Sequence, residues 1–427
     1  MRIKKFFLSL MATSAIFAAT LLMASTRAAA QQEILLLSFD GVGGQYPFTG
    51  LTFDAAGNLY GTTNAGGKYG EEFEGGTAYE LNREPGGGWT EKVLQNFGNG
   101  SIDAFYPEGI YPIGLIFDSA GNLYGTTSAG GDFGRYGDGV VFELSPNQGG
   151  GWTEKVLHQF GAKASDGVQP RAGLVFDAAG NLYGTTLYGG SYGNGAVFEL
   201  TPAAGGGWTE KILHSFNSNG KDGYEPPAGL IVDRNGNLYG TTLRGGQYNY
   251  GTAFELIPQT GGNWTEKILH DFSNAGGDGS FPTASLIFDA KGNLYSATQT
   301  GGAHGYGTAF ELIPAMDGTW SEKTLHSFEG LYAMDGAYLS ALTFDASGNL
   351  YGTAAGGGPY DAGTVFKLTS QPDGSWVEKT LYAFGTYRDR DGIAPDAGVI
   401  SDRFGNLYGT TASGGEYGNG TVFEITP

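Results

Sequence analysis

Four histidines have the spacing that most suggests chemistry in this sequence. They recur every 56 residues, at His158, His214, His270 and His326. A zinc ion needs all of its ligand atoms about 2 Å away. Residues spaced by 56 lie in different units of a repeat, each on the outermost strand of its unit, and are therefore too far apart to share one ion. Gln95 and Tyr382 take the same place in two other units. We therefore expect the histidines to pack between units, and the sequence predicts no metal site and no cofactor.

Aspartates recur in two further series. The first lies in long loops, at Asp103, Asp166, Asp222, Asp278, Asp335 and Asp391. A series of carboxylates at a channel mouth suits a divalent cation, which takes several oxygen ligands. The alternative, which we favour, is that each Asp shapes its own loop as an Asx turn. The second series lies in tight turns, and we interpret it as structural because one active site needs no seven copies: Asp54, Asp118, Asp177, Asp233, Asp289, Asp345 and Asp402.

No catalytic motif emerges from the sequence. It contains no G-x-S-x-G nucleophile elbow, no H-E-x-x-H zinc motif and no Walker-type phosphate loop. A pair of carboxylates for glycoside chemistry remains open, since two facing loops would suffice to supply it. The least repetitive charged residues near the expected channel entry are the first candidates for such chemistry: Arg171, Arg388, Asp389, Arg390 and Asp396.

A repeat positions all of these residues. The tetrapeptide Gly-Asn-Leu-Tyr occurs seven times, with asparagines at Asn58, Asn122, Asn181, Asn237, Asn293, Asn349 and Asn406. Each unit carries four short strand-like segments, which in the third unit read GLVFD, NLYGTTL, GAVFEL and WTEKILHSF. We label these segments a, b, c and d. Four antiparallel strands in each of seven units predict an all-β fold, a seven-bladed β-propeller.

The two ends of the sequence indicate how the propeller closes. The seventh unit stops after segment c, and its missing segment d matches EILLLSF at residues 33–39. We expect this N-terminal strand to complete the last blade and remove its open edge. An open solenoid would instead need polar capping units, and none is visible.

The repeat G-L-x-F-D-x-x-G-N-L-Y-G-T-T-x-x-G-G, followed by G-T-x-F-E-L, resembles the GloVer tandem repeat of exported bacterial proteins. The resemblance covers essentially the whole chain after the leader. It implies a propeller fold and export, and it assigns no activity. Related proteins often end in a sorting or anchoring tail, and no such tail is visible before Pro427.

The first thirty residues have the layout of a secretory signal peptide. Arg2, Lys4 and Lys5 precede an apolar run, and small residues lead to Ala30. The alternative is a retained membrane anchor. Residues 31–427 are expected to form a single propeller domain.

The mature chain is strongly acidic. The leader contains four of the 23 Lys and Arg residues and none of the 43 Asp and Glu residues, so its removal leaves a net charge of −24. This charge opposes nucleic-acid binding and favours a monomeric protein, secreted or periplasmic, with no later membrane span.

Loop lengths separate two faces of the expected propeller. The a–b and c–d turns keep their length, whereas the b–c and d–a loops vary, and variable loops on a rigid frame are where binding sites usually lie. We expect any ligand near blades 1 to 4 of that face, at Tyr69, Tyr136, Arg171, Tyr192, Arg244 and Tyr248. Alternatively, these tyrosines pack the glycine-rich loops against one another.

Two functions are compatible with this pattern. The first is a non-catalytic binding propeller, whose partner is a carbohydrate or another extracytoplasmic protein. The second is a polysaccharide hydrolase or lyase with its active site at the channel mouth. The near-identical repeat favours the first, and only the broken symmetry of a few loops favours the second.

Overall fold

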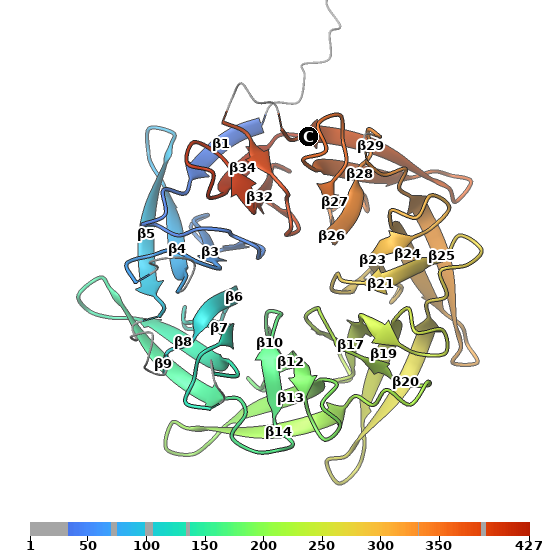
Figure 1. Cartoon of the computed structure of the whole chain (residues 1–427), viewed down its shortest axis with the longest axis horizontal. Helices are drawn as coiled ribbons and strands as arrows, with labels where there is room; N and C mark the ends of the chain where they lie inside the picture. The colour runs from blue at the N-terminus through green and yellow to red at the C-terminus, as the bar shows by residue number, and fades with distance from the viewer. Residues whose placement is uncertain (1–32, 70–74, 99–105, 134–136, 332, 386–389) are drawn as a thin grey trace, which may run out of the picture.

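Seven antiparallel blades, each built on four main strands, surround a central channel and form a β-propeller (Figure 1). Short additional strands occur in blades 3, 4, 5 and 7. The computed structural model describes residues 33–69, 75–98, 106–133, 137–331, 333–385 and 390–427. These residues form strands and turns, with no helix among them, and therefore no described helix is available to cross a membrane. The predicted fold class is confirmed.

The first three blades follow the order a to d along the chain. Blade 1 contains β2 (Thr52–Phe53), β3 (Leu59–Thr63), β4 (Thr77–Arg83) and β5 (Trp89–Asn96). Blade 2 contains β6 (Ile110–Phe117), β7 (Leu123–Ala129), β8 (Val140–Pro146) and β9 (Trp152–Gln159). Blade 3 contains β10 (Gly167–Pro170), β11 (Val175–Phe176), β12 (Leu182–Gly189), β13 (Ala196–Pro202) and β14 (Trp208–Ser215).

The next three blades repeat this plan. Blade 4 contains β15 (Gly223–Tyr224), β16 (Ile231–Val232), β17 (Leu238–Thr242), β18 (Arg244–Gly245), β19 (Thr252–Pro258) and β20 (Trp264–Asp271). Blade 5 contains β21 (Gly279–Pro282), β22 (Ile287–Phe288), β23 (Leu294–Gly301), β24 (Thr308–Pro314) and β25 (Trp320–Ser327). Blade 6 contains β26 (Ala337–Phe344), β27 (Leu350–Gly356), β28 (Thr364–Ser370) and β29 (Trp376–Ala383).

Blade 7 joins the two ends of the chain. It contains β30 (Gly392–Ile393), β31 (Ile400–Ser401), β32 (Leu407–Thr411), β33 (Ser413–Gly414) and β34 (Thr421–Ile425), and β1 (Glu33–Ser38) is its outermost strand. β1 pairs antiparallel with β34, from Glu33 opposite Ile425 to Ser38 opposite Thr421. The expected closure by the N-terminal strand is confirmed, and it pairs what would otherwise be a free sheet edge.

The aspartate of each a–b turn organises its hairpin through four hydrogen bonds. In blade 3, Oδ1 of Asp177 accepts the backbone N–H groups of Ala179 (2.8 Å) and Asn181 (2.9 Å). Its Oδ2 accepts the side-chain amide of Asn181 (2.8 Å) and the hydroxyl of Tyr183 (3.1 Å). The other six turns show the same pattern, so the structural interpretation of this aspartate series is confirmed.

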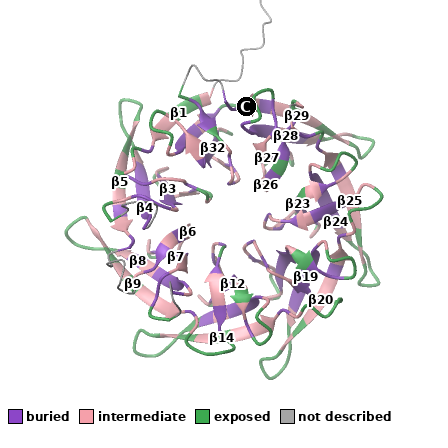
Figure 2. Cartoon of the chain, in the orientation of Figure 1, coloured by how far each residue is buried: buried purple, intermediate pink, exposed green. Residues whose placement is uncertain are grey.

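Aromatic side chains join each blade to the next. The Phe that ends strand d packs against the strand-c aromatic of the following blade, as Phe160 does with Phe198 at 5.1 Å between ring centroids. Phe39, which follows β1, makes the same contact with Tyr79 of blade 1 and closes the ring. Tryptophans at the start of strand d meet the strand-b Tyr of the preceding blade, as Trp208 meets Tyr124. The middle strands are therefore buried, and exposed turns lie at the periphery (Figure 2).

Deleting residues 31–39 should open the ring. The deletion removes the partner of β34 and the fully buried ring of Phe39, and truncating one buried Phe alone costs about 3–5 kcal/mol. We expect a lower melting temperature in calorimetry and self-association in size-exclusion chromatography, because the edge of β34 becomes free. Deleting only residues 31–32, which precede β1, serves as the control. Equal stability and a monomeric state in both truncations would contradict the clasp.

Replacing Asp177 with Ala should destabilise blade 3 by about 1–3 kcal/mol, since the turn amides lose their acceptor. Burial alone would raise the pKa of Asp177, but the hydrogen bonds from Asn181 outweigh burial and hold the pKa below its usual value. The stabilisation is therefore present at neutral pH and is lost as the pH falls through that lowered pKa. Urea unfolding at pH 7 and pH 2 would measure it. Asp132→Ala, at an exposed loop position, should change neither value.

Candidate binding site at the channel mouth

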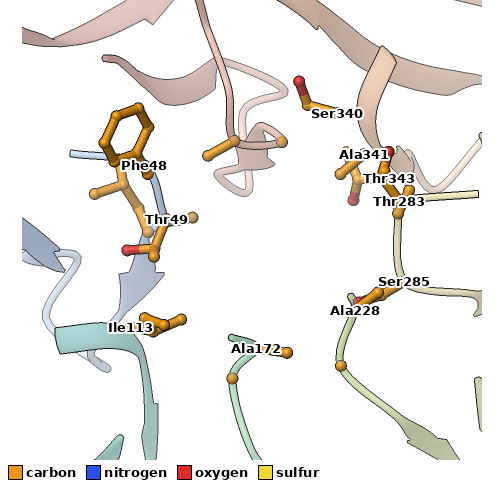
Figure 3. A pocket seen from close by; sticks show the side chains of 18 of the residues that line it. Phe48, Thr49, Ile113, Ala172, Ala228, Thr283, Ser285, Ser340, Ala341 and Thr343 are labelled. Atoms are coloured by element: carbon orange, nitrogen blue, oxygen red, sulfur yellow. The ribbon is translucent and has the colours of Figure 1, made fainter. Parts of the chain in front are cut away.

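One residue of each blade directly follows a Pro or Leu near the start of the inner strand, and all but Asp396 face the channel cavity. These residues are Phe48, Ile113, Arg171, Pro227, Thr283, Ser340 and Asp396, and we call them the mouth positions. Six of them line a channel cavity of about 420 Å³, to which all seven blades contribute. Figure 3 shows Phe48, Ile113, Thr283 and Ser340 around this open centre. The flanking residues are nearly constant, so chemical variety is concentrated at this position.

A second series of residues lies two positions earlier and has an unusual backbone conformation. Its φ angles fall between 55° and 60°, at Tyr46, Tyr111, Gln169, Glu225, Phe281, Tyr338 and Ala394. Each backbone N–H donates to a carbonyl of the preceding blade's b–c loop, as Gln169 does to Asp138 at 2.8 Å. Glycine would adopt this left-handed conformation without strain. All seven positions nevertheless carry a side chain, and such strain is concentrated at functional sites.

The mouth widens between blades 1, 2 and 3 into a cavity of about 480 Å³. Its lining includes Phe48, Asn64, Tyr111, Ser128 and Arg171. The ring of Phe48 stacks on that of Tyr46, with centroids 6.2 Å apart and planes inclined by 16°. The cavity therefore combines an aromatic surface, an amide, hydroxyls and one cation, in a volume that suits a small ligand.

Arg171 is the one predicted site residue that lies in this cavity. Its side chain is exposed, and no carboxylate among the described residues lies within ion-pair distance of it. Arg244 behaves differently, because its Nε lies 3.3 Å from Glu225 Oε2 and its guanidinium lies over the ring of Phe281. The charge of Arg244 is thus already paired, whereas that of Arg171 is available.

The predicted tyrosines lie on the outer part of the same face. Tyr192, Tyr248 and Tyr69 are 59%, 49% and 38% exposed, so part of each ring is open to solvent on this face. They belong to a series with one member in each blade, completed by Phe133, His304, Tyr360 and Tyr417, all of them exposed. None of the three lines either mouth cavity. Tyr136 lies outside the described residues.

Asp396 is the only carboxyl group among the seven mouth positions, all of which are described. Burial raises its pKa to about 6. Arg390 forms an ion pair with Glu416 at 2.7 Å, away from the channel cavity, and Arg388 and Asp389 lie outside the described residues. A glycosidase uses two carboxyl groups on opposite sides of the scissile bond, and the mouth positions supply one.

The loop aspartates do not form a cation site at the mouth. Each described member is turned toward the junction between two blades, where it accepts backbone N–H groups of its own loop, as Asp222 does from Asn217 at 2.9 Å. It also contacts the strand-d residue of the preceding blade: His158, His214, His270, His326 or Tyr382. The local, loop-shaping role is confirmed for these five aspartates, and Asp103 lies outside the described residues. The expected packing of the histidines between blades is also confirmed, with one Asp for each histidine.

Comparisons with known proteins identify a repeat family and a fold. A family model described as the Gloeobacter/Verrucomicrobia repeat matches residues 19–230, 111–341 and 317–427. No curated protein is detectably similar in sequence. The extracellular domain of a proposed one-component system from B. thetaiotaomicron is 10% identical, with a TM-score of 0.53 and coverage of 92% of this chain. This chain spans 40% of that structure.

Two other solved structures, a proposed oxidoreductase (glucose dehydrogenase) and a glucose dehydrogenase, match with lower TM-scores. One, from Thermus thermophilus, is 16% identical with a TM-score of 0.45, and the match covers 93% of this chain and 100% of that one. The other is 17% identical with a TM-score of 0.46, covering 93% and 99%.

Glu154 lies on β9, the outermost strand of blade 2. Replacing it with Gln should make the free energy of unfolding less dependent on pH. Burial, reinforced by the charge of Glu108, raises the pKa of Glu154 to about 8 although Gln95 donates a hydrogen bond to it. A carboxyl group with a raised pKa favours the folded state below its unfolded pKa, and this contribution is lost as pH rises toward 8. Chemical unfolding should show that the variant gains stability relative to wild type at pH 8 more than at pH 5. Glu84→Gln, at an exposed turn, should show no such difference.

Proposed function

The chain belongs to the Gloeobacter/Verrucomicrobia repeat family, and we propose that it is an exported, non-catalytic binding protein that holds an oligosaccharide at the mouth of its channel. The observation that carries this proposal is the asymmetric cavity between blades 1, 2 and 3. Arg171 is the only mouth position with a positive charge, and the other six have none. A single ligand requires such a departure from sevenfold symmetry.

The lining of the cavity suits a sugar. Aromatic rings such as those of Phe48 and Tyr111 offer flat apolar surfaces for the C–H face of a pyranose. Asn64 and Ser128 supply hydrogen-bonding groups for its hydroxyls. Arg171 would bind a carboxylate through two parallel hydrogen bonds. An oligosaccharide that contains a uronic acid combines these features.

Export and location follow from the leader in this proposal. Residues 1–30 would be removed as a signal peptide, and residues 31–427 would act outside the cytoplasm, secreted or periplasmic. A net charge of −24 would keep the mature protein monomeric and away from nucleic acid. The extracellular domain of a proposed one-component system from B. thetaiotaomicron contains a region with a similar fold, so the fold is compatible with that location. Another extracytoplasmic protein is the alternative partner for this face.

A hydrolase or lyase is not our proposal, because the mouth offers Asp396 without a second carboxyl group at an equivalent position. The exposed tyrosines Tyr192 and Tyr248 belong to the same face. They are candidates for stacking against a ligand that extends beyond the cavity.

A glycan array probed with residues 31–427 should identify bound oligosaccharides, and calorimetry should then measure their affinity. We expect Arg171→Gln to weaken binding of a uronate-containing ligand at least about tenfold, since a hydrogen bond to a charged group contributes about 1.5–3 kcal/mol. Its neutral analogue should lose less affinity. Phe48→Ala should weaken both ligands.

Two substitutions on the opposite face provide matched controls. Arg234→Gln removes a cation from an a–b turn, and Phe404→Ala removes an exposed aromatic ring from another. Both should leave affinity unchanged. Binding that these controls abolish, while Arg171→Gln and Phe48→Ala leave it intact, would place the ligand on the other face. Binding of a protein but of no glycan would favour the alternative partner.

A further inference from the structure

A glutamate from the next blade joins the histidine–aspartate pair at two blade junctions. Between blades 3 and 4, His214 Nε2 lies 3.2 Å from Asp222 Oδ2 and 3.8 Å from Glu266 Oε1. Between blades 2 and 3, His158, Asp166 and Glu210 form the same arrangement. In each group, one ligand atom from every residue lies within 4.8 Å of the other two. An imidazole and two carboxylates thus converge on one small volume.

Three of the four carboxyl groups in these clusters have a buried oxygen without a hydrogen-bond partner among the described residues: Glu210, Asp222 and Glu266. The side chain of Glu210 is 7% exposed, and its Oε1 has no hydrogen-bond partner among the described residues. Lys163 approaches its other oxygen only to 4.0 Å and is 70% exposed. Oε1 of Glu266 and Oδ1 of Asp222 accept no hydrogen bond from an N–H or hydroxyl group of the described residues. A buried carboxylate is costly unless a proton or a cation compensates it.

The next two junctions show how the same glutamate is held in another way. There the residue two positions after the glutamate is a threonine. Thr324 Oγ1 lies 3.2 Å from Glu322 Oε1, and Thr380 Oγ1 lies 3.1 Å from Glu378 Oε1. Each hydroxyl shares its proton with a backbone carbonyl, that of Gly277 at 3.2 Å or that of Met334 at 2.8 Å. The corresponding residues in blades 3 and 4 are Ile212 and Ile268, which have no hydroxyl. Only the two junctions with isoleucine bring the described histidine, aspartate and glutamate together.

We propose that His158–Asp166–Glu210 and His214–Asp222–Glu266 are two binding sites for a divalent transition-metal ion of the Zn²⁺ class. One imidazole nitrogen and two carboxylate oxygens are a ligand set that zinc accepts, with water as the fourth ligand. Ligand atoms 2.0–2.2 Å from a tetrahedral ion are separated by about 3.3–3.6 Å. The distances of 3.2 and 3.8 Å from His214 are close to this separation.

Such an ion would fasten blade to blade. It would connect strand d of one blade, the following d–a loop and strand d of the next blade. Asp166 directly precedes β10, which leads to Arg171, so the ion would also anchor the segment that carries this mouth residue. Histidine spacing predicted no metal site, because histidines of different blades lie too far apart to share one ion. In the proposed sites they share none, since each histidine meets two carboxylates of its own.

Zinc binding by the untagged mature chain tests the assignment. In calorimetry, protein stripped with a chelator should take up two equivalents of Zn²⁺. After gel filtration, elemental analysis should still find two equivalents bound to the protein. Glu266→Gln should leave one equivalent, and Glu210→Gln together with Glu266→Gln should leave none. Glu322→Gln together with Glu378→Gln is the matched control and should leave two. Thermal melting should show that Zn²⁺ stabilises the wild type but not the first double variant.

Ile212→Thr and Ile268→Thr provide a second test that uses a sequence already present in blades 5 and 6. The new hydroxyl should hold the glutamate and weaken Zn²⁺ binding at that junction at least tenfold. Uptake of less than one equivalent by the wild type, or a stoichiometry that the glutamate changes leave intact, would overturn both sites. One equivalent that only one of the glutamate changes removes would support that junction and overturn the other. Glycan binding is measured separately, so either proposal can fail alone.

Discussion

The packing of each blade against the next is the constraint on which this structure depends. A four-stranded sheet of this size cannot bury its own faces, and the aromatic contacts at the junctions, such as Phe216 against Phe254 at 5.3 Å, bury them pairwise. The series of contacts ends without a free face only because β1 supplies the last strand of blade 7. With no cysteine in the chain, this packing and the turn hydrogen bonds hold the ring together.

The same constraint limits where function can lie. Residues needed at every junction and turn recur in every blade, whereas a single ligand requires an asymmetric set of side chains. The mouth positions ease this conflict, because six of them line the channel cavity. Two of these six, Thr283 and Ser340, also donate a hydrogen bond to a backbone carbonyl of the next blade. Phe48, Arg171 and Asp396 occupy equivalent places and differ completely in chemistry. The left-handed residues that precede them fix the direction in which the chain enters the mouth.

Much of the fold could be predicted from the repeat alone. The Gly-Asn-Leu-Tyr series determined the number of blades, and the match between EILLLSF and strand d indicated the closure. The site was less accessible, because Arg171 was found as a departure from the repeat but Phe48 and Tyr111 were not. Their signal was present in the variable residues on either side of the recurring proline. It could not be interpreted without knowing that this segment turns into the channel in a left-handed conformation. Likewise, the glutamate of strand d recurs in WTEK, but only the structure shows that it reaches the preceding blade's histidine.

Hydrogen–deuterium exchange of residues 31–427, with and without a bound oligosaccharide, tests most directly whether the ligand binds at the channel mouth between blades 1, 2 and 3. We expect slower exchange on binding in residues 45–49, 110–113 and 168–172, which contribute to the cavity, with no change in the a–b and c–d turns. Protection of residues 233–237 and 402–406 in those turns, with the cavity segments unaffected, would contradict it.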